Sequence, residues 1–530
     1  MKLNAQSLNN TPFWEKAGIA LPRFDREKMI IATKAAPKWI HFGPGNIFRA
    51  FPAAMMQQLI EQGLETTGII VAEGYDGEII DKCFSPLDNL TILVTLKADG
   101  TTEKKVIASI AASYRMDNDY EALKEIFKAP ALQMASFTIT EKGYSITGRD
   151  GTLLPNITED INKGPASPKS YLGQIAGLLF ERYKNGAVPL AMVSMDNCSH
   201  NGDILFAAME TITKGWVDNN FANTGFLDYI RSKVSFPWSM IDKITPRPDE
   251  SVQGMLVSAG LEDMQGFVTA KNTYVAPFVN AEETQYLIIE DQFPNGRPAL
   301  DKTGVLFTDK ETVDRVEKMK VCTCLNPLHT SLAVFGCLLG YTRISEEMKD
   351  ADLVKLIKGV GYIEGLPVVT DPGIIKPKDF IDQVINVRLP NPFMPDAPQR
   401  IAMDTSLKIP IRFGETLKEY IKTGRSCSNL KFIPLVFAGW LRYLLGIDDN
   451  GNPFEVSPDP QYETLSTALT GITLGPDQLC PQVKPILSNP AFFGVNLYEA
   501  GLGEKVEELF KQMLAGSGAV RKALKNTVIT

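Results

Sequence analysis

Short apolar, β-branched runs alternate with amphipathic stretches through the first half of the chain. The runs lie at residues 38–42, 68–72, 133–140 and 188–195, and helical spacing is found over residues 47–62 and 170–184. Continuous apolar runs of this length are typical of strands that are buried on both faces of a sheet. Strands and helices in this order predict βαβ units, and therefore an α/β domain with a parallel sheet.

The second half of the chain has mostly helical periodicity. Apolar residues recur at helical spacing over residues 313–324, 328–339, 352–359, 380–387, 415–422, 433–445 and 504–514. The composition changes near residues 286–306, where the run Phe293-Pro-Asn-Gly-Arg-Pro298 predicts a loop. We therefore expect an α/β domain with an N-terminal extension at residues 1–290, followed by a mainly α-helical domain at residues 291–530.

Composition narrows the class of protein. The chain has 530 residues, of which 44% are apolar, and 62 acidic residues outnumber 54 basic ones to give a net charge of −8. An acidic chain lacks the dominant basic surface that nucleic-acid binding requires. No secretory signal is found at the N-terminus, and the apolar stretches are shorter than the roughly 20 residues of a membrane span. We expect a cytoplasmic protein without nucleic-acid or membrane partners.

Cysteine and histidine usage bears on metal chemistry. The seven cysteines are dispersed and odd in number, and the three histidines are His41, His200 and His329. Dispersed cysteines suit reduced thiols, and no CxxC pair is present to anchor zinc. We therefore expect no metal site.

A glycine-rich turn follows the first predicted strand. Gly43 and Gly45 lie between the strand at residues 38–42 and the helix that begins near residue 47. Such a turn lets backbone N–H groups face a pyrophosphate, although Phe48 stands where the usual third glycine would be. Glu73 ends the next strand, where a carboxylate would meet the adenosine ribose and favour NAD over NADP, and Asp76 could share that role. An ordinary turn with a solvated Glu73 is the alternative.

Six ordered segments together resemble the mannitol dehydrogenase family of long-chain polyol and hexuronate dehydrogenases. The segments are Gly43–Phe51, Thr140-Glu-Lys-Gly-Tyr144, Ser194–Gly202, Phe236–Pro246, Ile289–Pro298 and Arg400–Lys408. The resemblance covers roughly residues 39–412 and implies an extended Rossmann-type dinucleotide-binding domain. It also implies that the cofactor lies against Gly43, Gly45, Asn46, Ile47, Arg49, Glu73 and Asp76.

The resemblance further implies metal-independent hydride transfer between a nicotinamide and a secondary alcohol or ketone. The family's catalytic lysine, asparagine and histidine correspond to Lys320, Asn326 and His329. A lysine can give a proton to a ketone oxygen or take one from an alcohol, and carboxamide N–H groups can stabilise an oxyanion without adding charge. Asn197 could also stabilise the oxyanion, and Glu141 could relay protons or position the lysine.

The spacing of the catalytic stretch departs from the family pattern. Five residues separate Lys320 from Asn326, whereas the family usually has four. On a regular helix the extra residue would rotate the lysine by about 100°. Pro327 follows Asn326 and removes a backbone donor, so we predict a π-bulge or loop between Val321 and Leu325 that keeps Lys320 near Asn326. Lys318 is the alternative base.

Several of these residues also have purely structural interpretations. His41 lies on an apolar strand and is expected to be a satisfied core histidine, whereas His200 is either a helix cap or a neighbour of the nicotinamide. Asp196 and Asp242 are expected to hold the site together by hydrogen bonding, and the resemblance places Asp242 at the substrate. Arg400 and Lys408 fit a pair of substrate-facing cations, with surface ion pairs as the alternative.

The nature of the substrate follows from the same resemblance. A hexuronate carries a carboxylate that needs a cation, which Arg400 and Lys408 could supply. We therefore expect a small sugar acid as substrate, with interconversion of D-fructuronate and D-mannonate favoured. A tagaturonate reductase, a mannitol-type polyol dehydrogenase and a non-catalytic NAD(H)-binding sensor remain open, as does the choice between a monomer and a small homo-oligomer.

Overall fold

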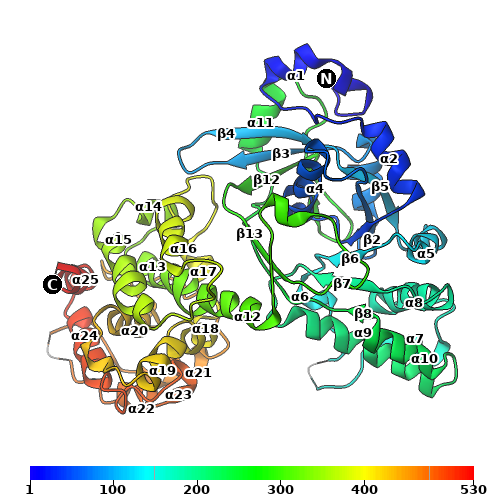
Figure 1. Cartoon of the computed structure of the whole chain (residues 1–530). Helices are drawn as coiled ribbons and strands as arrows, with labels where there is room; N and C mark the ends of the chain where they lie inside the picture. The colour runs from blue at the N-terminus through cyan, green and yellow to red at the C-terminus, as the bar shows by residue number, and fades with distance from the viewer. Residues whose placement is uncertain (149, 477, 530) are drawn as a thin grey trace. The chain divides into compact units, whose positions relative to one another are not determined.

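The computed structural model describes residues 1–148, 150–476 and 478–529, and the chain divides into two compact units (Figure 1). Unit 1 contains Met1–Leu96 and Thr101–Val313, and unit 2 contains Lys97–Gly100 and Asp314–Thr530. The predicted boundary fell at residue 290. The chain continues in unit 1 beyond that point because β14 (Leu306–Thr308) pairs with β13 (Tyr286–Glu290) in the same sheet.

Unit 1 is built on a six-stranded parallel sheet. In spatial order its strands are β5 (Ile110–Arg115), β2 (Ile69–Glu73), β1 (Trp39–Phe42), β6 (Met134–Phe137), β7 (Leu190–Ser194) and β8 (Val234–Ser235). Four of them, β1, β2, β6 and β7, are the strands predicted from the apolar runs. The chain leaves β1 toward β2 and returns on its other side at β6, so the carboxyl ends of β1 and β6 form the switch point at which such sheets bind nucleotides.

Three smaller sheets complete unit 1, and the sequence pattern did not predict them. One pairs β3 (Thr91–Leu96) with β4 (Thr102–Ile107) and β12 (Phe278–Glu282), and another pairs β9 (Ser239–Asp242) with β13 and β14. The third is the two-stranded β10 (Phe267–Val268) and β11 (Tyr274–Val275). Strand β12 lies parallel to β3, although almost two hundred residues separate them, so no local signal could reveal this pairing.

Helices cover the large sheet and bury its faces. The helices of unit 1 are α1 (Thr11–Ala17), α2 (Arg26–Ala35), α3 (Asn46–Ala50), α4 (Pro52–Glu61), α5 (Tyr120–Lys128), α6 (Thr140–Gly143), α7 (Pro155–Lys163), α8 (Tyr171–Lys184), α9 (Asn201–Asp218), α10 (Thr224–Ser232) and α11 (Glu250–Ser258). One continuous core joins the strands to α5, α8, α9 and α10, which lie along the same side in Figure 1. Met192, Met195 and Met240 are buried, as predicted.

Unit 2 is helical among its described residues. Its helices are α13 (Asn326–Leu338), α14 (Ile344–Glu347), α15 (Ala351–Lys358), α16 (Pro377–Gln383), α17 (Pro398–Ile401), α18 (Thr405–Arg412), α19 (Gly414–Lys422), α20 (Phe432–Tyr443), α21 (Tyr462–Ala468), α22 (Val483–Leu487), α23 (Pro490–Phe493), α24 (Gly503–Leu514) and α25 (Ala519–Ile529). Helix α12 (Lys310–Met319) leads into it from unit 1. The buried helices α13 and α20 pack against each other at its centre.

Four π-helical segments interrupt the regular helices. They are η2 (Ile80–Phe84) in unit 1, and η5 (Lys320–Cys324), η6 (Gly359–Gly365) and η8 (Val384–Arg388) in unit 2. The short 3₁₀ segments are η1 (Gln6–Asn9), η3 (Ser85–Leu87), η4 (Leu300–Thr303), η7 (Leu366–Val368) and η9 (Cys427–Asn429). The predicted π-bulge before Asn326 is confirmed by η5, in which the N–H of Leu325 donates to the C=O of Lys320, five residues earlier.

Candidate functional site

The turn after β1 requires glycine at its first position for two separate reasons. Gly43 has φ +97°, a left-handed conformation that side chains rarely adopt. A Cβ atom at Gly43 would also lie 2.2 Å from the carbonyl oxygen of Thr138, which follows β6. The turn is therefore packed tightly between β1 and β6, at the switch point of the sheet.

The second glycine of the turn faces open space. No atom lies within 4 Å of the position that a Cβ of Gly45 would occupy, and Gly45 has an ordinary negative φ as the residue before α3. A cofactor could approach the backbone closely here, as a dinucleotide site requires. Asn46 and Ile47 follow in the first turn of α3 and are partly buried.

Arg49 of α3 points into the protein. Its guanidinium is 2% exposed and donates to the Ala276 carbonyl at 2.8 Å and to Asn46 Oδ1 at 2.9 Å. The Arg49 side chain thus fixes the orientation of the Asn46 amide and ties α3 to the strand that follows Ala276. Burial lowers the pKa of Arg49, with Cys83 nearby opposing the shift.

Glu73 is the last residue of β2, and Asp76 lies three residues beyond it. Glu73 Oε1 accepts hydrogen bonds from the N–H groups of Tyr75 at 2.6 Å and Asp76 at 2.8 Å, and the side chain is buried. Burial raises the pKa of the Glu73 carboxyl, and those two N–H groups oppose the shift. Asp76 is also buried and accepts a hydrogen bond from the Thr269 hydroxyl at 2.5 Å.

Asp196 joins the loops that follow β6 and β7. Its carboxylate accepts hydrogen bonds from Ile139 N at 2.8 Å, Thr140 N at 3.1 Å and the Tyr144 hydroxyl at 2.7 Å. Burial raises the pKa of Asp196, while these three donors lower it. Asp196 therefore has the structural role predicted for it, and it holds together the two loops that carry Glu141 and Asn197. Both of these side chains are exposed.

Asn201 connects the loop after β7 to β9. Asn201 Nδ2 donates to the carbonyl oxygens of Asp196 at 3.1 Å and Ser239 at 3.0 Å, and Asn201 Oδ1 accepts from Ser239 N. Asp242 ends β9 and is buried. His200 precedes α9 with φ +54°, makes no capping hydrogen bond with its side chain and stacks on Trp238 at 4.0 Å.

His41 is a core residue, as predicted. Its ring is fully buried, with Nδ1 2.7 Å from Ser136 Oγ, Nε2 2.9 Å from Thr138 Oγ1, and Phe48 stacked on one face. Burial lowers the pKa of His41 to about 3, so the imidazole is neutral at physiological pH.

The Lys-Asn-His stretch lies wholly in unit 2, on η5 and the start of α13. Lys320 is 8% exposed, whereas the side chain of Lys318 is 58% exposed and pairs with Asp314 at 2.8 Å. Asn326 and His329 lie three residues apart in the first turn of α13 and share one side of it. Burial therefore favours Lys320 over Lys318 as the base.

Cations surround His329. Its pKa is lowered to about 4, chiefly by burial and also by Arg412, Arg400 and Arg388, while Asp396 opposes the shift. Arg400 forms an ion pair with Asp396, and the Lys408 ammonium donates to the carbonyl oxygens of Ile401 and Met403. Lys408 is therefore held against the backbone of the segment that carries Arg400.

Arg412 and Asp396 are the residues of this cluster that the sequence did not single out. Arg412 Nη1 donates to Thr330 Oγ1 at 2.6 Å, and that hydroxyl donates to the Asn326 carbonyl at 2.9 Å. Among the described residues, no carboxylate forms an ion pair with Arg412. Burial alone lowers its pKa to about 10. The Arg–Ile–Ala–Met–Asp run indicated Arg400, but no local pattern distinguishes Arg412, which is identified by its hydrogen bond to Thr330 in the helix that carries His329.

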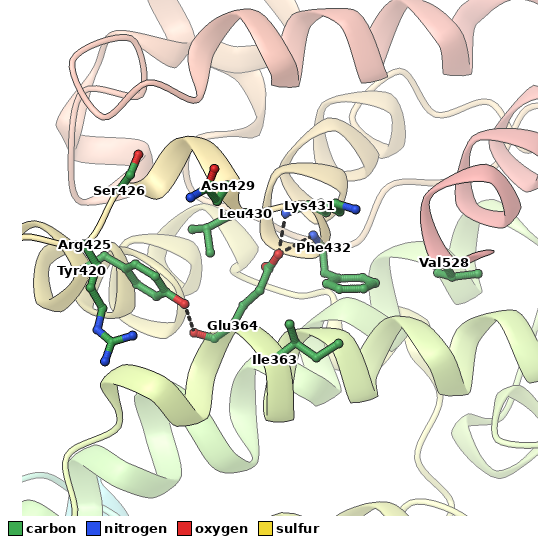
Figure 2. Close-up of a pocket in the computed structure, with 10 residues that line it drawn as sticks. All are labelled: Ile363, Glu364, Tyr420, Arg425, Ser426, Asn429, Leu430, Lys431, Phe432 and Val528. Carbon is green, nitrogen blue, oxygen red and sulfur yellow. Dashed lines mark hydrogen bonds between the residues drawn. The ribbon is translucent and has the colours of Figure 1, made fainter. Parts of the chain in front are cut away.

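A separate cavity of about 620 Å³ lies elsewhere in unit 2 (Figure 2). Its wall includes Glu364, Tyr420, Arg425 and Lys431. The Glu364 carboxylate accepts hydrogen bonds from the N–H groups of Lys431 and Phe432, and the Tyr420 hydroxyl donates to the Glu364 carbonyl (Figure 2). None of the predicted site residues lines this cavity, so its shape gives no support to the predicted chemistry.

The structure also bears on metal binding and on membrane insertion. Within residues 1–148, 150–476 and 478–529, no group of three or more His, Cys, Asp and Glu side chains is placed to hold a metal ion. The helical run Lys310–Leu338 has the length and mean hydropathy, 1.4, of a membrane span, but 72% of its most apolar window is buried inside the protein. That burial is typical of a core helix.

Comparison with known proteins covers nearly the whole chain. The model for the mannitol dehydrogenase Rossmann domain matches residues 37–302, and that for the mannitol dehydrogenase C-terminal domain matches residues 312–513. The D-mannonate oxidoreductase of Thermotoga maritima is 53% identical over 535 residues, covering 100% of this chain and 99% of that one. The mannitol 2-dehydrogenase of Neosartorya fischeri is 29% identical over 477 residues, 88% of each chain.

Solved structures agree with these matches. A D-sorbitol dehydrogenase in substrate-free form superimposes with a TM-score of 0.80 at 26% identity, covering 96% of this chain and 98% of that one. The mannitol 2-dehydrogenase of Pseudomonas fluorescens, in a ternary complex with NAD and D-mannitol, gives 0.69 at 27% identity, covering 100% and 99%. The two family models and the full-length relative agree with the six sequence motifs, and this chain belongs to the mannitol dehydrogenase family.

Proposed function

We propose that this protein is an NAD-dependent oxidoreductase that interconverts D-fructuronate and D-mannonate. The observation that carries the proposal is the 53% identity to a D-mannonate oxidoreductase along the full length of both chains. The cations around His329 support it, because the carboxylate of a hexuronate requires a positively charged partner. Arg412, with no ion-pair partner among the described residues, joins Arg400 and Lys408 as a candidate for that contact.

The turn after β1 fits a dinucleotide. Gly45 leaves open space beside the backbone, Asn46 is held in place by Arg49, and Glu73 is fixed at the end of β2 with one oxygen bound to backbone N–H groups. We infer that these residues, with Gly43, Ile47 and Asp76, hold NAD, and that Glu73 binds the adenosine ribose. Bound NAD supplies the hydride transfer that no side chain can provide.

The remaining roles concern the substrate. Lys320 gives a proton to the carbonyl oxygen during reduction and takes one from the hydroxyl during oxidation. Asn326 and Asn197 donate N–H groups to that oxygen as negative charge develops. His329 and Asp242 bind substrate hydroxyl groups, and Glu141 relays the proton of Lys320 or positions its ammonium.

The experiment is a panel of substrates with NADH, followed by absorbance. We expect turnover of fructuronate to exceed that of tagaturonate and fructose, and Lys320→Met to lower kcat by roughly 10²–10⁴-fold. Lys318→Met is the matched control, because that neighbouring side chain is exposed and should be dispensable. Preference for fructose would favour a mannitol-type enzyme, and NADH binding without turnover would favour a sensor.

We further propose that the protein works in the cytoplasm as a monomer or small homo-oligomer without a membrane partner. The acidic composition and the buried apolar helix support this proposal. Light scattering coupled to size-exclusion chromatography measures the oligomeric state, and fractionation of the cell lysate tests the location.

A further inference from the structure

One carboxylate faces the imidazole of His329 inside unit 2. His329 Nε2 lies 3.6 Å from Asp396 Oδ2, and this nitrogen is buried without a hydrogen bond. Asp396 is 8% exposed, and its other oxygen, Oδ1, accepts a hydrogen bond from Arg400 Nη2. Arg400, Asp396 and His329 therefore form a continuous chain of charged and titratable groups that ends on the imidazole.

The position of Asp396 is fixed by its surroundings. Its backbone carbonyl accepts a hydrogen bond from Ile344 N, at the start of α14, at 2.9 Å. Arg400 is four residues further on in α17, which packs against α13, the helix that carries His329. The backbone of Asp396 is thus fixed at the start of α14, and its carboxylate is held beside the ring by the Arg400 ion pair.

The charges around the ring make the location of its single proton important. Burial disfavours the imidazolium most, Arg412, Arg400 and Arg388 disfavour it further, and Asp396 opposes them. The ring is therefore neutral at physiological pH, with one N–H donor and one acceptor nitrogen. The nitrogen that carries the proton decides whether the ring donates to a substrate oxygen or accepts from a substrate hydroxyl.

We propose that Asp396 is a positioning residue that keeps the His329 proton on Nε2, so that Nδ1 accepts a hydrogen bond from a substrate hydroxyl. A carboxylate can only accept, so the opposite tautomer would place two lone pairs against each other. Arg400 stabilises the ionised carboxylate and occupies Oδ1, which leaves Oδ2 for the ring. The hydroxyl contact rests on the proposed function, whereas the tautomer is a property of this chain alone.

The tautomer can be measured directly because the chain has only three histidines. In protein labelled with ¹⁵N in the histidine rings, His329→Gln assigns the His329 signals. We expect the Nε2–H form in the parent protein. In Asp396→Asn, Arg400 should keep the amide oxygen and leave the NH₂ group facing the ring, which drives the proton to Nδ1. Asp396→Glu should restore the Nε2–H form, at least in part.

Two controls keep the outcome clear. His41, which bonds to Ser136 and Thr138 in unit 1, should show unchanged ring signals in every variant. Arg400→Gln should keep the Nε2–H form while raising the pKa of His329, because one neighbouring cation is lost and the carboxylate remains. If Asp396→Asn does not fold, the ring signals of the parent protein and of Asp396→Glu decide the proposal, and an Nδ1–H form in the parent protein would overturn it.

Kinetics then test the consequence for the substrate. We expect Asp396→Asn to lower kcat/KM for fructuronate by roughly 10–100-fold, with recovery in Asp396→Glu and little change in the unfolding temperature. An unchanged His329 tautomer in folded Asp396→Asn would overturn the proposal. Because the ring signals require no substrate, a chain that turned over no hexuronate would refute the proposed function and leave the tautomer proposal decidable.

Discussion

Two arginines, the buried Arg182 in unit 1 and the half-buried Arg412 in unit 2, are held in very different ways. Arg182 of α8 is 1% exposed and donates all five of its N–H groups to the carbonyl oxygens of Val188, Phe127, Ala129, Leu132 and Pro189. Arg412 of α18 donates one hydrogen bond, to Thr330, and has no ion-pair partner among the described residues. Neither guanidinium has a carboxylate partner within the described parts of the chain, yet only Arg182 has all five of its N–H groups bound by the fold.

The difference separates a structural cation from one available to a ligand. Because Arg412 is only half-buried, the N–H groups that the fold does not bind are left to solvent or to a ligand. The carbonyl oxygens around Arg182 belong to the segments that lead into β6 and β7, so this side chain supports the parallel sheet. The unused donors of Arg412 lie near His329, where an anionic substrate would complete them.

We expect the largest effects when each arginine is replaced by methionine. Arg182→Met should lower the free energy of unfolding by roughly 3–5 kcal/mol, because it leaves several buried carbonyl groups without donors. Arg412→Met should change it by less than about 1 kcal/mol and reduce kcat/KM for fructuronate by roughly 10–100-fold. Denaturant unfolding and NADH-linked kinetics give the two readouts.

Arg442 provides a control within unit 2. Its guanidinium is fully buried and donates to the carbonyl oxygens of Met513, Ile447 and Asp448. Arg442→Met should therefore behave like Arg182→Met and not like Arg412→Met. If Arg412→Met destabilised the protein as strongly as Arg442→Met, the distinction between the two kinds of arginine would be lost.

In the turn after β1 of unit 1, we expect Gly43 to affect stability and Gly45 to affect cofactor binding. Gly43→Ala should cost roughly 2–4 kcal/mol of stability, because the new Cβ meets the Thr138 carbonyl in a left-handed backbone conformation. Gly45→Ala should fold normally, since its Cβ meets no protein atom, and should bind NADH more weakly. NADH fluorescence titration and thermal unfolding distinguish these results, and unchanged NADH affinity in Gly45→Ala would argue against the cofactor assignment.

A buried acid in unit 2 predicts a pH dependence of stability. Glu347 is fully buried, neither of its oxygens has a hydrogen-bond partner, and burial raises its pKa well above the usual 4.5. At a pH between the pKa of Glu347 in the unfolded chain and its higher pKa in the folded protein, the unfolded chain binds fewer protons at this residue than the folded protein does. The contribution of Glu347 is thus complete below about pH 4.5 and falls as pH rises, by at most about 1.4 kcal/mol per pH unit.

Glu347→Gln removes this titration. The free energy of unfolding of the variant should fall less steeply between pH 5 and 8 than that of the parent protein, as measured by urea denaturation at each pH. Because His41 and His329 have lowered pKa values, they act in the opposite direction below about pH 6.5 in both proteins. Parallel pH profiles would show that Glu347 is ionised in the folded state.

The smallest effect is expected at the end of β2. Glu73→Gln removes the negative charge that opposes a 2′-phosphate while keeping an oxygen to accept from the Tyr75 and Asp76 N–H groups. The ratio of kcat/KM values for NADH and NADPH should fall by roughly 3–10-fold. Asp76→Asn is the comparison, and a larger change there would transfer the ribose role to Asp76.

Much of the fold was predictable because it depends on local patterns. The four central strands, α8 and seven helices of the second half (α12, α13, α15, α16, α19, α20 and α24) follow from apolar periodicity. An inserted residue followed by Pro327 predicted η5. The same holds for the buried role of His41 and for Asp196 as a hydrogen-bonding bracket. These residues lie next to motifs whose geometry is encoded within a few positions.

The rest depends on contacts between distant segments. Strands β3 and β12 pair across a long separation, and β14 extends unit 1 beyond residue 290. The π-helices η2, η6 and η8 were not predicted, although a proline (Pro86, Pro367 and Pro390) follows each of them. Asp396 and Arg412 become candidates only when burial and distance to His329 are known. Whether the predicted residues act in catalysis is a question for the variants described above.

The π-helix η5 has a consequence for how such chains are compared. Its hydrogen bond from Leu325 to Lys320 accommodates one more residue than an α-helical turn within the same helical run. The extra residue is therefore taken up within the π-helical segment, between α12 and α13. Pattern searches that demand a fixed number of residues between the lysine and the asparagine would discard this sequence, whereas searches that permit one gap at that position would retain it.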